Sequence, residues 1–317
     1  MDFDNVIFSG GFSIVPPPPP PEAYGFWGGG GYGVTNSSIY RVAFSNDTTS
    51  LTRGSIPVAG LNASGTGNDQ FGYWGGTRGP TPTSSIWRIT FATDTNNGIG
   101  RGSLSAGRYN IGTVTDGTTN GWFGGGINFP TRFSLVDRIT YSNDTATATV
   151  RGPLSVGKNS LIGIGNTSFG WFTGGTIGGF PIIQYSTVDR ITFATDSATA
   201  SVRGPLTAAV YLHGGTGNSD FGWLTGGRST ALSSISRIQY STDTATATLR
   251  GPFTRTRHQA AGTGNSTYGW FGGGYSAGSN SSSVDRIEYA SDTNTALLRG
   301  VLPAAVYYRD GATTGLI

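Results

Sequence analysis

Short stretches in which apolar and polar residues alternate recur along the chain, and each predicts a β-strand. In residues 136–141 and 284–289, β-branched and aromatic residues recur with the two-residue period of a strand. Other stretches are aromatic and end in glycine, as in residues 122–125, which suits a place where backbones approach closely. Turns with an Asp followed by Thr or Ser link the strands, because Asp bonds the backbone two residues on. The pattern predicts an all-β protein.

The strands follow one another in the same order six times. Each repeat has an aromatic strand, an alternating strand with an Arg, an Asp turn, a strand that ends in Arg-Gly, and a connection to a short last strand. The aromatic strands open at Gly25, Gly72, Gly121, Gly170, Gly222 and Gly269, so successive openings lie 47, 49, 49, 52 and 47 residues apart. A fixed period between about 20 and 50 residues indicates a solenoid, propeller or array, because one unit cannot bury its apolar faces alone.

The spacing also predicts how the repeats close. The Arg of the Arg-Gly pair precedes the next opening glycine by 19 or 20 residues, and a step of 19 from Arg299 lands one position beyond Ile317. We therefore expect an all-β, six-bladed β-propeller of four-stranded blades over residues 24–317. Residues 304–315 would form the innermost strand of the blade that begins at Gly25. Strand exchange between the N- and C-terminal segments would then close the ring.

Residues 1–23 form a separate element in this interpretation. Pro16 to Pro21 are six consecutive prolines, a stiff polyproline II spacer of roughly 19 Å. The alternative is a disordered tail, but such tails do not need several large apolar side chains. We expect an anchoring arm that binds a partner subunit, as an added strand for example, through Phe3, Ile7, Phe8, Phe12 and Ile14.

Composition agrees with a rigid extracellular or virion-borne β-protein. Charged residues are 12% of the chain, against roughly 25% in ordinary domains, and 53 of the 317 residues are glycine. The net charge of +3 is too small to indicate nucleic acid as a partner. The chain has no cysteine, and no apolar run is long enough for membrane insertion. Residues 1–4 lack the basic start of a secretory signal, so ordinary export is not expected.

Most cationic residues occupy repeated positions, which favours a structural role. Twelve of the 20 cationic residues are such arginines, expected to stack on aromatic rings or bond the turn carboxylates. They are Arg41, Arg88, Arg138, Arg190, Arg237 and Arg286, and Arg53, Arg101, Arg151, Arg203, Arg250 and Arg299. The six turn Asp residues could be imagined as a calcium ring but lack clustered oxygen ligands. His213 and His258 are too few for a histidine-rich metal site, so no metal, no cofactor and no enzymatic activity are expected.

The connections that differ between repeats indicate where binding occurs. In a four-stranded blade, the second-to-third and fourth-to-first connections emerge on one face, and here they vary in length and hold all the cations outside the repeated positions. We expect this face to be basic and to bind a partner. The opposite face should be uniform and acidic, with the turn Asp residues and Asp69, Asp116 and Asp220. The expected binding residues are Arg132, Phe133, Tyr185, Arg228, Arg255, Arg257, His258 and Tyr275.

The order of an aromatic Gly-Gly strand, an alternating strand, a hairpin turn and a fourth strand resembles a Kelch-like β-propeller. Arginines replace that family's usual Tyr and Trp of the later strands. Residues 136–155, from Val-Asp-Arg-Ile-Thr-Tyr to Arg-Gly-Pro-Leu-Ser, are similar to repeats of the virion structural proteins of marine cyanophages. This resemblance covers all six repeats and implies a phage appendage, tail fibre or capsid decoration protein. It identifies no ligand and no active-site residues.

These observations favour a non-catalytic virion structural or adhesion protein that presents a basic loop face for binding. The expected partners are other virion proteins, bound through residues 1–23, and host surface polysaccharide is a further candidate for carbohydrate binding by the loop face. The expected location is the virion, assembled in the host cytoplasm, and the alternative is an extracellular appendage. Alternative functions are a pure assembly protein whose loop face packs on a virion subunit, a secreted lectin, and a glycan-processing enzyme. A homo-oligomer is a further expectation.

Overall fold

The computed structural model describes residues 24–28, 37–57, 62–79, 81–177, 182–228, 233–306 and 313–314. The described chain is all-β, with several four-stranded sheets and short 3-10 helices. Residues 1–23 lie outside the described residues, and with them the expected anchoring residues Phe3, Ile7, Phe8, Phe12 and Ile14.

Strands of four kinds recur in the order that the sequence predicts. The inner strands are β28 (Thr313–Thr314), β4 (Ser64–Gly67), β8 (Gly112–Thr115), β14 (Ile162–Gly165), β18 (Gly215–Gly217) and β22 (Ala261–Gly264). The aromatic strands are β1 (Tyr24–Gly28), β5 (Phe71–Gly75), β9 (Asn120–Gly124), β15 (Phe169–Thr173), β19 (Phe221–Thr225) and β23 (Tyr268–Gly272). The arginine strands are β2 (Ser38–Ala43), β6 (Ser85–Thr90), β12 (Val136–Thr140), β16 (Val188–Thr192), β20 (Ile235–Gln239) and β26 (Ser283–Glu288). The outer strands are β3 (Asn46–Ser55), β7 (Ile99–Ser103), β13 (Thr149–Arg151), β17 (Ser201–Arg203), β21 (Thr248–Arg250) and β27 (Leu297–Val301).

One strand of each kind forms an antiparallel set in the order inner, aromatic, arginine, outer. We call each set a group and number the groups by their aromatic strands, so that group 1 is β28-β1-β2-β3 and group 6 is β22-β23-β26-β27. Groups 2 to 5 are separate four-stranded sheets. Groups 1 and 6 are joined into one eight-stranded sheet, because Val301 of β27 pairs in parallel with Thr49 of β3. The separate blades expected from the sequence are therefore merged at this place.

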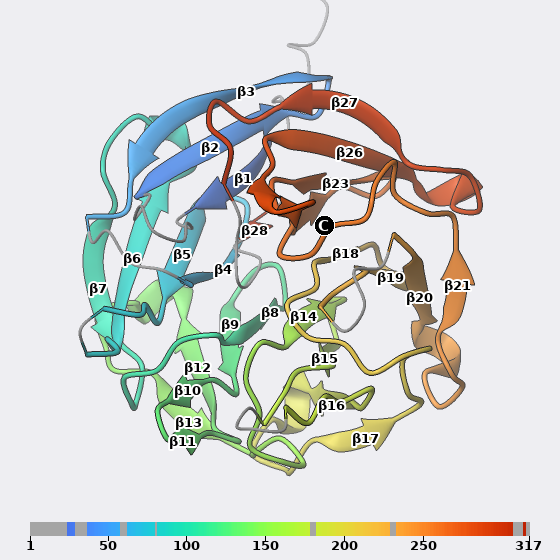
Figure 1. Cartoon of the computed structure of the whole chain (residues 1–317). Coiled ribbons are helices and arrows are strands. Elements are labelled where there is room, and N and C mark those ends of the chain that lie inside the picture. Colours follow the sequence, from blue (N-terminus) through green and yellow to red (C-terminus); the bar gives the residue numbers. More distant parts are fainter. Residues whose placement is uncertain are drawn as a thin grey trace, which may run out of the picture.

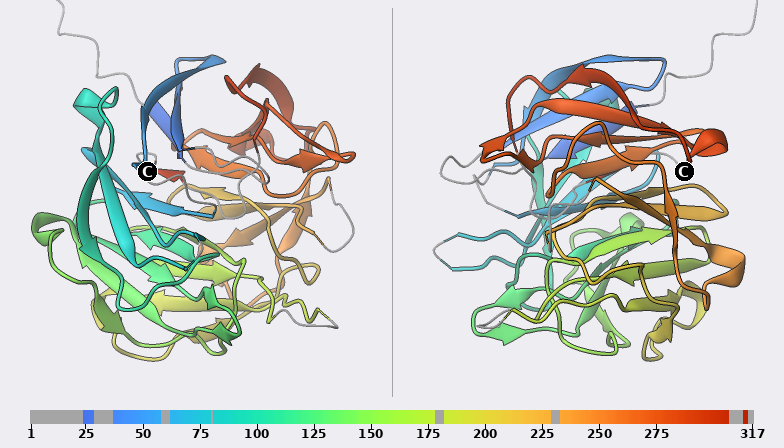
Figure 2. Two further views of the ribbon diagram at one scale, coloured as in Figure 1. Left: turned by 60° about the vertical axis from the view of Figure 1, so that its left-hand side comes forward. Right: turned by 45° about the vertical axis from the view of Figure 1, so that its right-hand side comes forward.

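The groups surround a central region and turn their inner strands towards it (Figure 1). Side views show the groups splayed around that region, an arrangement consistent with a propeller-like fold (Figure 2). The C-terminal strand β28 is antiparallel to β1, with Thr314 opposite Phe26 and Thr313 opposite Trp27. Residues from the two ends of the described chain thus lie in one group, as the repeat spacing predicts.

The turns between the arginine and outer strands differ from the tight hairpin turns expected. In groups 2 to 6 they contain short 3-10 helices, each followed by the repeated Asp in the right-handed helical conformation. The helices are η1 (Phe91–Thr93), η2 (Tyr141–Asn143), η3 (Phe193–Thr195), η4 (Tyr240–Thr242) and η5 (Tyr289–Ser291). In every group the repeated Asp lies against the preceding group, and Asp47 of group 1 does so without a 3-10 helix.

The hydrophobic core is divided among the boundaries between neighbouring groups. One cluster, for example, joins Trp223 and Ile235 of group 5 to Phe271 and Ile287 of group 6. At every boundary, an aromatic ring of one group stacks on an aromatic ring of the next. The stacked pairs are Phe26–Phe91, Tyr73–Tyr141, Trp122–Phe193, Trp171–Tyr240, Trp223–Tyr289 and Trp270–Phe44. Since no group can bury its rings alone, the groups stabilise one another.

Candidate functional site

The repeated arginines and Asp residues form one ionic joint at each boundary. At the boundary of groups 3 and 4, Asp196 accepts hydrogen bonds from Arg138 Nη1 at 3.1 Å and from Trp122 Nε1 at 2.8 Å. Arg151 Nε lies 3.4 Å from the same carboxylate. Arg138 lies directly opposite Trp122 in the antiparallel pair, so both side chains project from one face of the sheet towards the next group.

The same joint recurs at the other boundaries, which confirms the structural role expected for the repeated arginines. Two arginines of one group contact Asp94, Asp144, Asp243, Asp292 and Asp47 of the next. The arginine of the arginine strand also stacks on the first ring of its aromatic strand where that ring is Phe or Tyr, as Arg190 does on Phe169 at 4.5 Å. All twelve repeated arginines are therefore half-buried and held in ion pairs between neighbouring groups.

The glycine after each outer-strand Arg is explained by the same joint. Gly152 donates its N–H to the backbone oxygen of Asp196 at 2.8 Å, so the turn of the next group lies directly against it. A methyl group at Gly152 would overlap the carbonyl oxygen of Ala198. Only glycine permits this approach, which accounts for the Arg-Gly pair in every repeat.

Three further cations are buried in ion pairs inside single groups, and this corrects the binding role expected for Arg257. The pairs are Arg108–Asp137 at 2.9 Å, Lys158–Asp189 at 2.9 Å and Arg257–Asp285 at 2.6 Å, and every one of these side chains is 0% exposed. Burial lowers the pKa of Lys158, and the charge of Asp189 opposes that shift. The Arg257 side chain is fully buried and cannot be reached by a partner, so Arg257 does not belong to a binding surface.

Corresponding positions in other repeats hold no such pair. Where the connection has Val210 or Val306 in place of the cation, the residue before the arginine-strand Arg is Ser236 or Tyr40 in place of Asp. The sequence therefore contains a signal for these buried ion pairs: the cation of the connection and the Asp before the arginine-strand Arg are present together or absent together. A buried carboxylate without its cation would be strongly destabilising, so both residues change together.

Arg257 instead fixes the base of a hairpin in group 6. It donates from Nη1 to the carbonyl oxygens of Gly273 and Ser283, which flank the hairpin, at 3.0 Å and 3.1 Å. The hairpin consists of β24 (Tyr275–Ser276) and β25 (Ser279–Asn280). Its two turn residues, Ala277 and Gly278, both have positive φ angles, as a type I′ turn requires.

A surface groove of about 370 Å³ lies between this hairpin and the outer strand of group 6. The exposed side chain of Arg255 lines it, together with hydroxyl and amide groups of the hairpin and with Leu298 and Val301. Ser276 ties the hairpin down by donating to the carbonyl oxygen of Thr256 at 2.7 Å. Next to the groove, the ring of His258 stacks on Tyr275, with centroids 5.4 Å apart. Of the expected binding residues, Arg255 lines the groove, and His258 and Tyr275 contact each other.

Arg132 and Phe133 lie on a second hairpin, in group 3. It consists of β10 (Ile127–Asn128) and β11 (Thr131–Arg132). Phe129, at the tip, is 74% exposed, and the guanidinium of Arg132 lies 5.9 Å from its ring centre. Phe133 is half-buried, with Arg108 at 5.9 Å from its ring. The tip therefore presents an apolar ring next to a cation.

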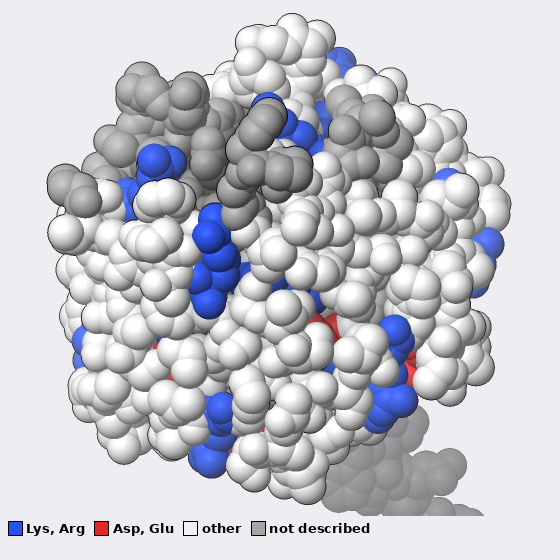
Figure 3. Space-filling view, turned by 60° about the horizontal axis from the view of Figure 1, so that its bottom comes forward, with Lys and Arg blue, Asp and Glu red and all other residues white. Residues whose placement is uncertain are grey.

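The remaining expected residues belong to other groups. Tyr185 is half-buried in the connection that precedes β16, and Arg228 is exposed after β19. Among the described residues, the cations that are not buried and not part of a joint are Arg78, Arg132, Arg228 and Arg255, and they are spread over several groups rather than clustered. Figure 3 shows such separated basic patches on a largely uncharged surface.

The expected division into a basic and an acidic face needs correction. We call the end of the groups that holds the hairpins and the outer-to-inner connections the hairpin end, and the opposite end the turn end. The repeated Asp residues of the turn end are buried and paired with arginines, so they add little surface charge. Of the other acids expected there, Asp69 and Asp220 are exposed and Asp116 is half-buried. The turn end is therefore less acidic than expected.

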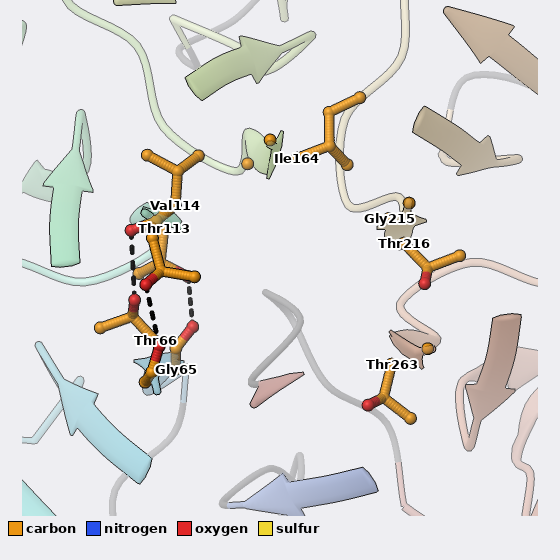
Figure 4. Close-up of a pocket in the computed structure, with 14 residues that line it drawn as sticks. Gly65, Thr66, Thr113, Val114, Ile164, Gly215, Thr216 and Thr263 are labelled. Atoms are coloured by element: carbon orange, nitrogen blue, oxygen red, sulfur yellow. Dashed lines mark hydrogen bonds between the residues drawn. The ribbon is translucent and has the colours of Figure 1, made fainter. Parts of the chain in front are cut away.

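The central region contains a cavity of about 90 Å³ between the inner strands (Figure 4). Gly, Thr, Val and Ile residues line it. Several threonine hydroxyls there link neighbouring groups: Thr66 donates to Val114 O at 3.1 Å and Thr115 donates to Gly67 O at 2.8 Å. The lining residues of this cavity have no titratable side chain, so they offer no acid, base or charged group to a ligand.

One buried titratable group, His213, lies at the boundary of groups 4 and 5. Its Nε2 lies 2.9 Å from the Thr173 hydroxyl, and its Nδ1 has no hydrogen-bond partner in the described structure. Burial, and secondarily the charge of Lys158, lowers the pKa of His213 to about 3. This histidine is therefore neutral at physiological pH.

In the described parts of the chain, no group of three or more His, Cys, Asp or Glu side chains is placed to hold a metal ion. No helix of these residues is long and apolar enough to cross a membrane. Comparisons with protein-family models and with curated proteins found no match to this chain.

Proposed function

We propose that the protein is a non-catalytic structural or adhesion component of a phage virion, part of an appendage, a fibre or a capsid decoration. Its scaffold in this proposal is a six-bladed β-propeller, in which each group is one blade and the pairing of β28 with β1 closes the ring. The boundary of groups 6 and 1 supports this closure. Trp270 and Arg299 bond Asp47 across 223 and 252 residues, in the same way that a tryptophan and two arginines meet the Asp at the boundaries of groups 3 and 4, 4 and 5, and 5 and 6.

The observation that carries the binding part of the proposal is the contrast between the two ends of the groups. The repeated Asp residues at the turn end are paired with arginines in the joints, and the connections there are nearly uniform. The hairpin end differs from group to group and carries the exposed Arg255 beside its groove. Variable loops on a rigid scaffold are where recognition usually occurs.

The ligand that fits the Arg255 groove is an acidic polysaccharide of a host surface. Arg255 supplies positive charge, and the serines and Asn280 of the hairpin supply hydroxyl and amide groups for sugar hydroxyls. The binding test uses immobilised alginate, with dextran as the uncharged comparison. We expect retention on alginate that falls strongly between about 50 and 500 mM salt and is lost in the Arg255→Ser variant.

Arg78→Ser serves as the matched control, because Arg78 is an exposed arginine of a different group. Equal retention of the wild-type protein and the Arg255→Ser variant would overturn the ligand assignment. Retention on dextran equal to that on alginate would overturn the charge argument.

We propose further that residues 1–23 anchor the protein to other virion proteins. Within the described structure β1 already has β28 on one side and β2 on the other, so the fold does not need the N-terminal residues to complete its sheet. Removing residues 1–15 should leave a folded protein that no longer joins its particle. Normal incorporation of the truncated protein would contradict the anchoring role.

A second candidate function is assembly alone, in which the hairpin end packs on another virion subunit. The exposed apolar residues favour it, since Phe129, Ile182 and Ile183 are 74%, 50% and 52% exposed in connections of groups 3 and 4. In that case Phe129→Ser with Ile182→Ser would block incorporation into particles, and the wild-type protein would not be retained on alginate.

A further inference from the structure

We propose a second binding site, at the turn end between groups 4 and 5, for a neutral pyranose sugar. A groove of about 440 Å³ opens there, between the turns that precede the aromatic strands β15 and β19. Its size lies in the range of about 300–1,000 Å³ that is typical of small-molecule sites. Neither the joints nor the hairpin-end ligand uses this groove, so the inference is independent of the proposed function.

Two half-buried aromatic rings line the groove, Phe169 from group 4 and Phe221 from group 5. Each ring is held by a guanidinium, with Arg190 at 4.5 Å from the centre of Phe169 and Arg237 at 4.4 Å from the centre of Phe221. The arginines are in turn fixed by Asp243 and Asp292. The rings therefore form rigid apolar surfaces on which the C–H face of a sugar ring can pack without ordering a loop.

Polar groups that suit vicinal hydroxyls surround these rings. The exposed carboxylate of Asp220 has no ion pair and no side-chain hydrogen bond within the described structure. The backbone N–H of Asp220 donates to Asn218 Oδ1 at 3.0 Å, which holds the turn in place. Gln239 donates from Nε2 to the Ser241 hydroxyl at 3.0 Å. Asn166 donates to the Ser219 carbonyl oxygen at 3.3 Å and thereby links the turns of the two groups.

The charge of the groove selects the class of sugar. Its one ionisable group apart from Tyr240 is the Asp220 carboxylate, and the nearby arginines are already paired. A carboxylate accepts hydrogen bonds from sugar hydroxyls but repels an acidic sugar. The site therefore favours a neutral pyranose, in contrast to the acidic polymer proposed for the hairpin end.

The fold does not require these polar residues. Two positions before the opening glycine, where group 5 has Asp220, other repeats have Ser168 and Thr267. Two positions after the arginine-strand Arg, where group 5 has Gln239, other repeats have Thr192 and Glu288. Group 5 alone combines a carboxylate with an amide here, at an end of the molecule that is otherwise nearly uniform.

The test uses the methyl glycosides of glucose, galactose and mannose, with methyl glucuronide as the acidic comparison, and detects binding by saturation-transfer NMR on the full chain. We expect at least one neutral glycoside to bind in a way that does not depend on salt, and the glucuronide not to bind. The double variant Asp220→Thr with Gln239→Thr should weaken binding about tenfold or more, because two hydrogen-bonding groups are lost.

Both substitutions introduce a residue that another repeat carries at the same position, so the variant should fold normally. Gln70→Thr, at the position of group 2 that corresponds to Asp220, is the matched control and should bind like the wild type. Absence of binding by all three neutral glycosides, or equal binding by the double variant, would overturn the proposal. Arg255→Ser should leave this binding intact, which separates a failure here from a failure of the hairpin-end site.

Discussion

Arg286 donates from Nη1 to Asp47 Oδ2 at 2.8 Å, and so links the last group of the chain to the first. Trp270 and Arg299 donate to the same carboxylate at 2.9 Å each. Burial by itself would raise the pKa of Asp47, but the hydrogen bonds from Trp270 and Arg299 and the charge of Arg286 outweigh it, so the pKa is lowered. One carboxylate thus collects three donors from residues more than 220 positions away.

The first prediction compares this joint with one between sequential groups. Asp47→Ala and Asp196→Ala should each lower the free energy of unfolding by about 2–4 kcal/mol, because both leave two arginines and a tryptophan N–H without their acceptor. Denaturant unfolding measures the effect, and Asp69→Ala, at an exposed acid, is the control. A cost at Asp47 far below that at Asp196 would show that the ends of the chain are not joined in solution.

The second prediction concerns the C-terminal segment. Deleting residues 303–317 removes β28 from β1 and takes Val306 out of the core cluster that contains Trp27 and Trp270. The unpaired edge and the exposed rings should cause aggregation or loss of cooperative unfolding. Calorimetry and light scattering detect both effects. A truncated protein that melts like the full chain would contradict closure through β28.

The third prediction uses the matched replacement in the buried ion pairs. Asp189→Ser alone should cost about 3–5 kcal/mol, since it leaves the Lys158 ammonium buried without a countercharge. The double variant Lys158→Val with Asp189→Ser reproduces Val210 and Ser236 of group 5 and should cost about 1 kcal/mol or less. A double-mutant cycle measures the coupling. Additive costs would contradict the dependence of the two residues on each other.

The fourth prediction is a pH dependence that arises from His213. Because its pKa is lowered to about 3 in the folded state, against about 6.5 in an unfolded chain, the unfolded state binds the proton first as the pH falls. The contribution of neutral His213 to the free energy of unfolding is fully present above about pH 6.5. Below that pH it decreases by up to about 1.4 kcal/mol per pH unit, until the pH reaches the pKa of the folded state.

Unfolding measured from about pH 7 to pH 5, above the titration of most carboxylates, isolates this contribution. His213→Gln should flatten the dependence. An unchanged slope in His213→Gln would contradict the burial of a neutral imidazole.

The sequence predicted the strands and the structural role of the repeated arginines, because both are local or periodic. The alternation in residues 136–141 is a property of neighbouring residues, and it became β12 (Val136–Thr140). The six equivalent positions of residues such as Arg138 and Arg151 could be counted, and a feature present in every repeat serves the contact between repeats.

The tertiary structure showed which cations of the variable connections are buried, although the matched replacement of cation and carboxylate between repeats leaves a trace of these pairs in the sequence. Arg255 and Arg257 are two positions apart in the same variable connection, yet the first lines a groove and the second lies beneath it against Asp285. Sequence distance could not separate them, because the partner of Arg257 is on a different strand. The merging of groups 1 and 6 through Val301 and Thr49, and the sugar-sized groove between Phe169 and Phe221, likewise depend on how neighbouring groups pack.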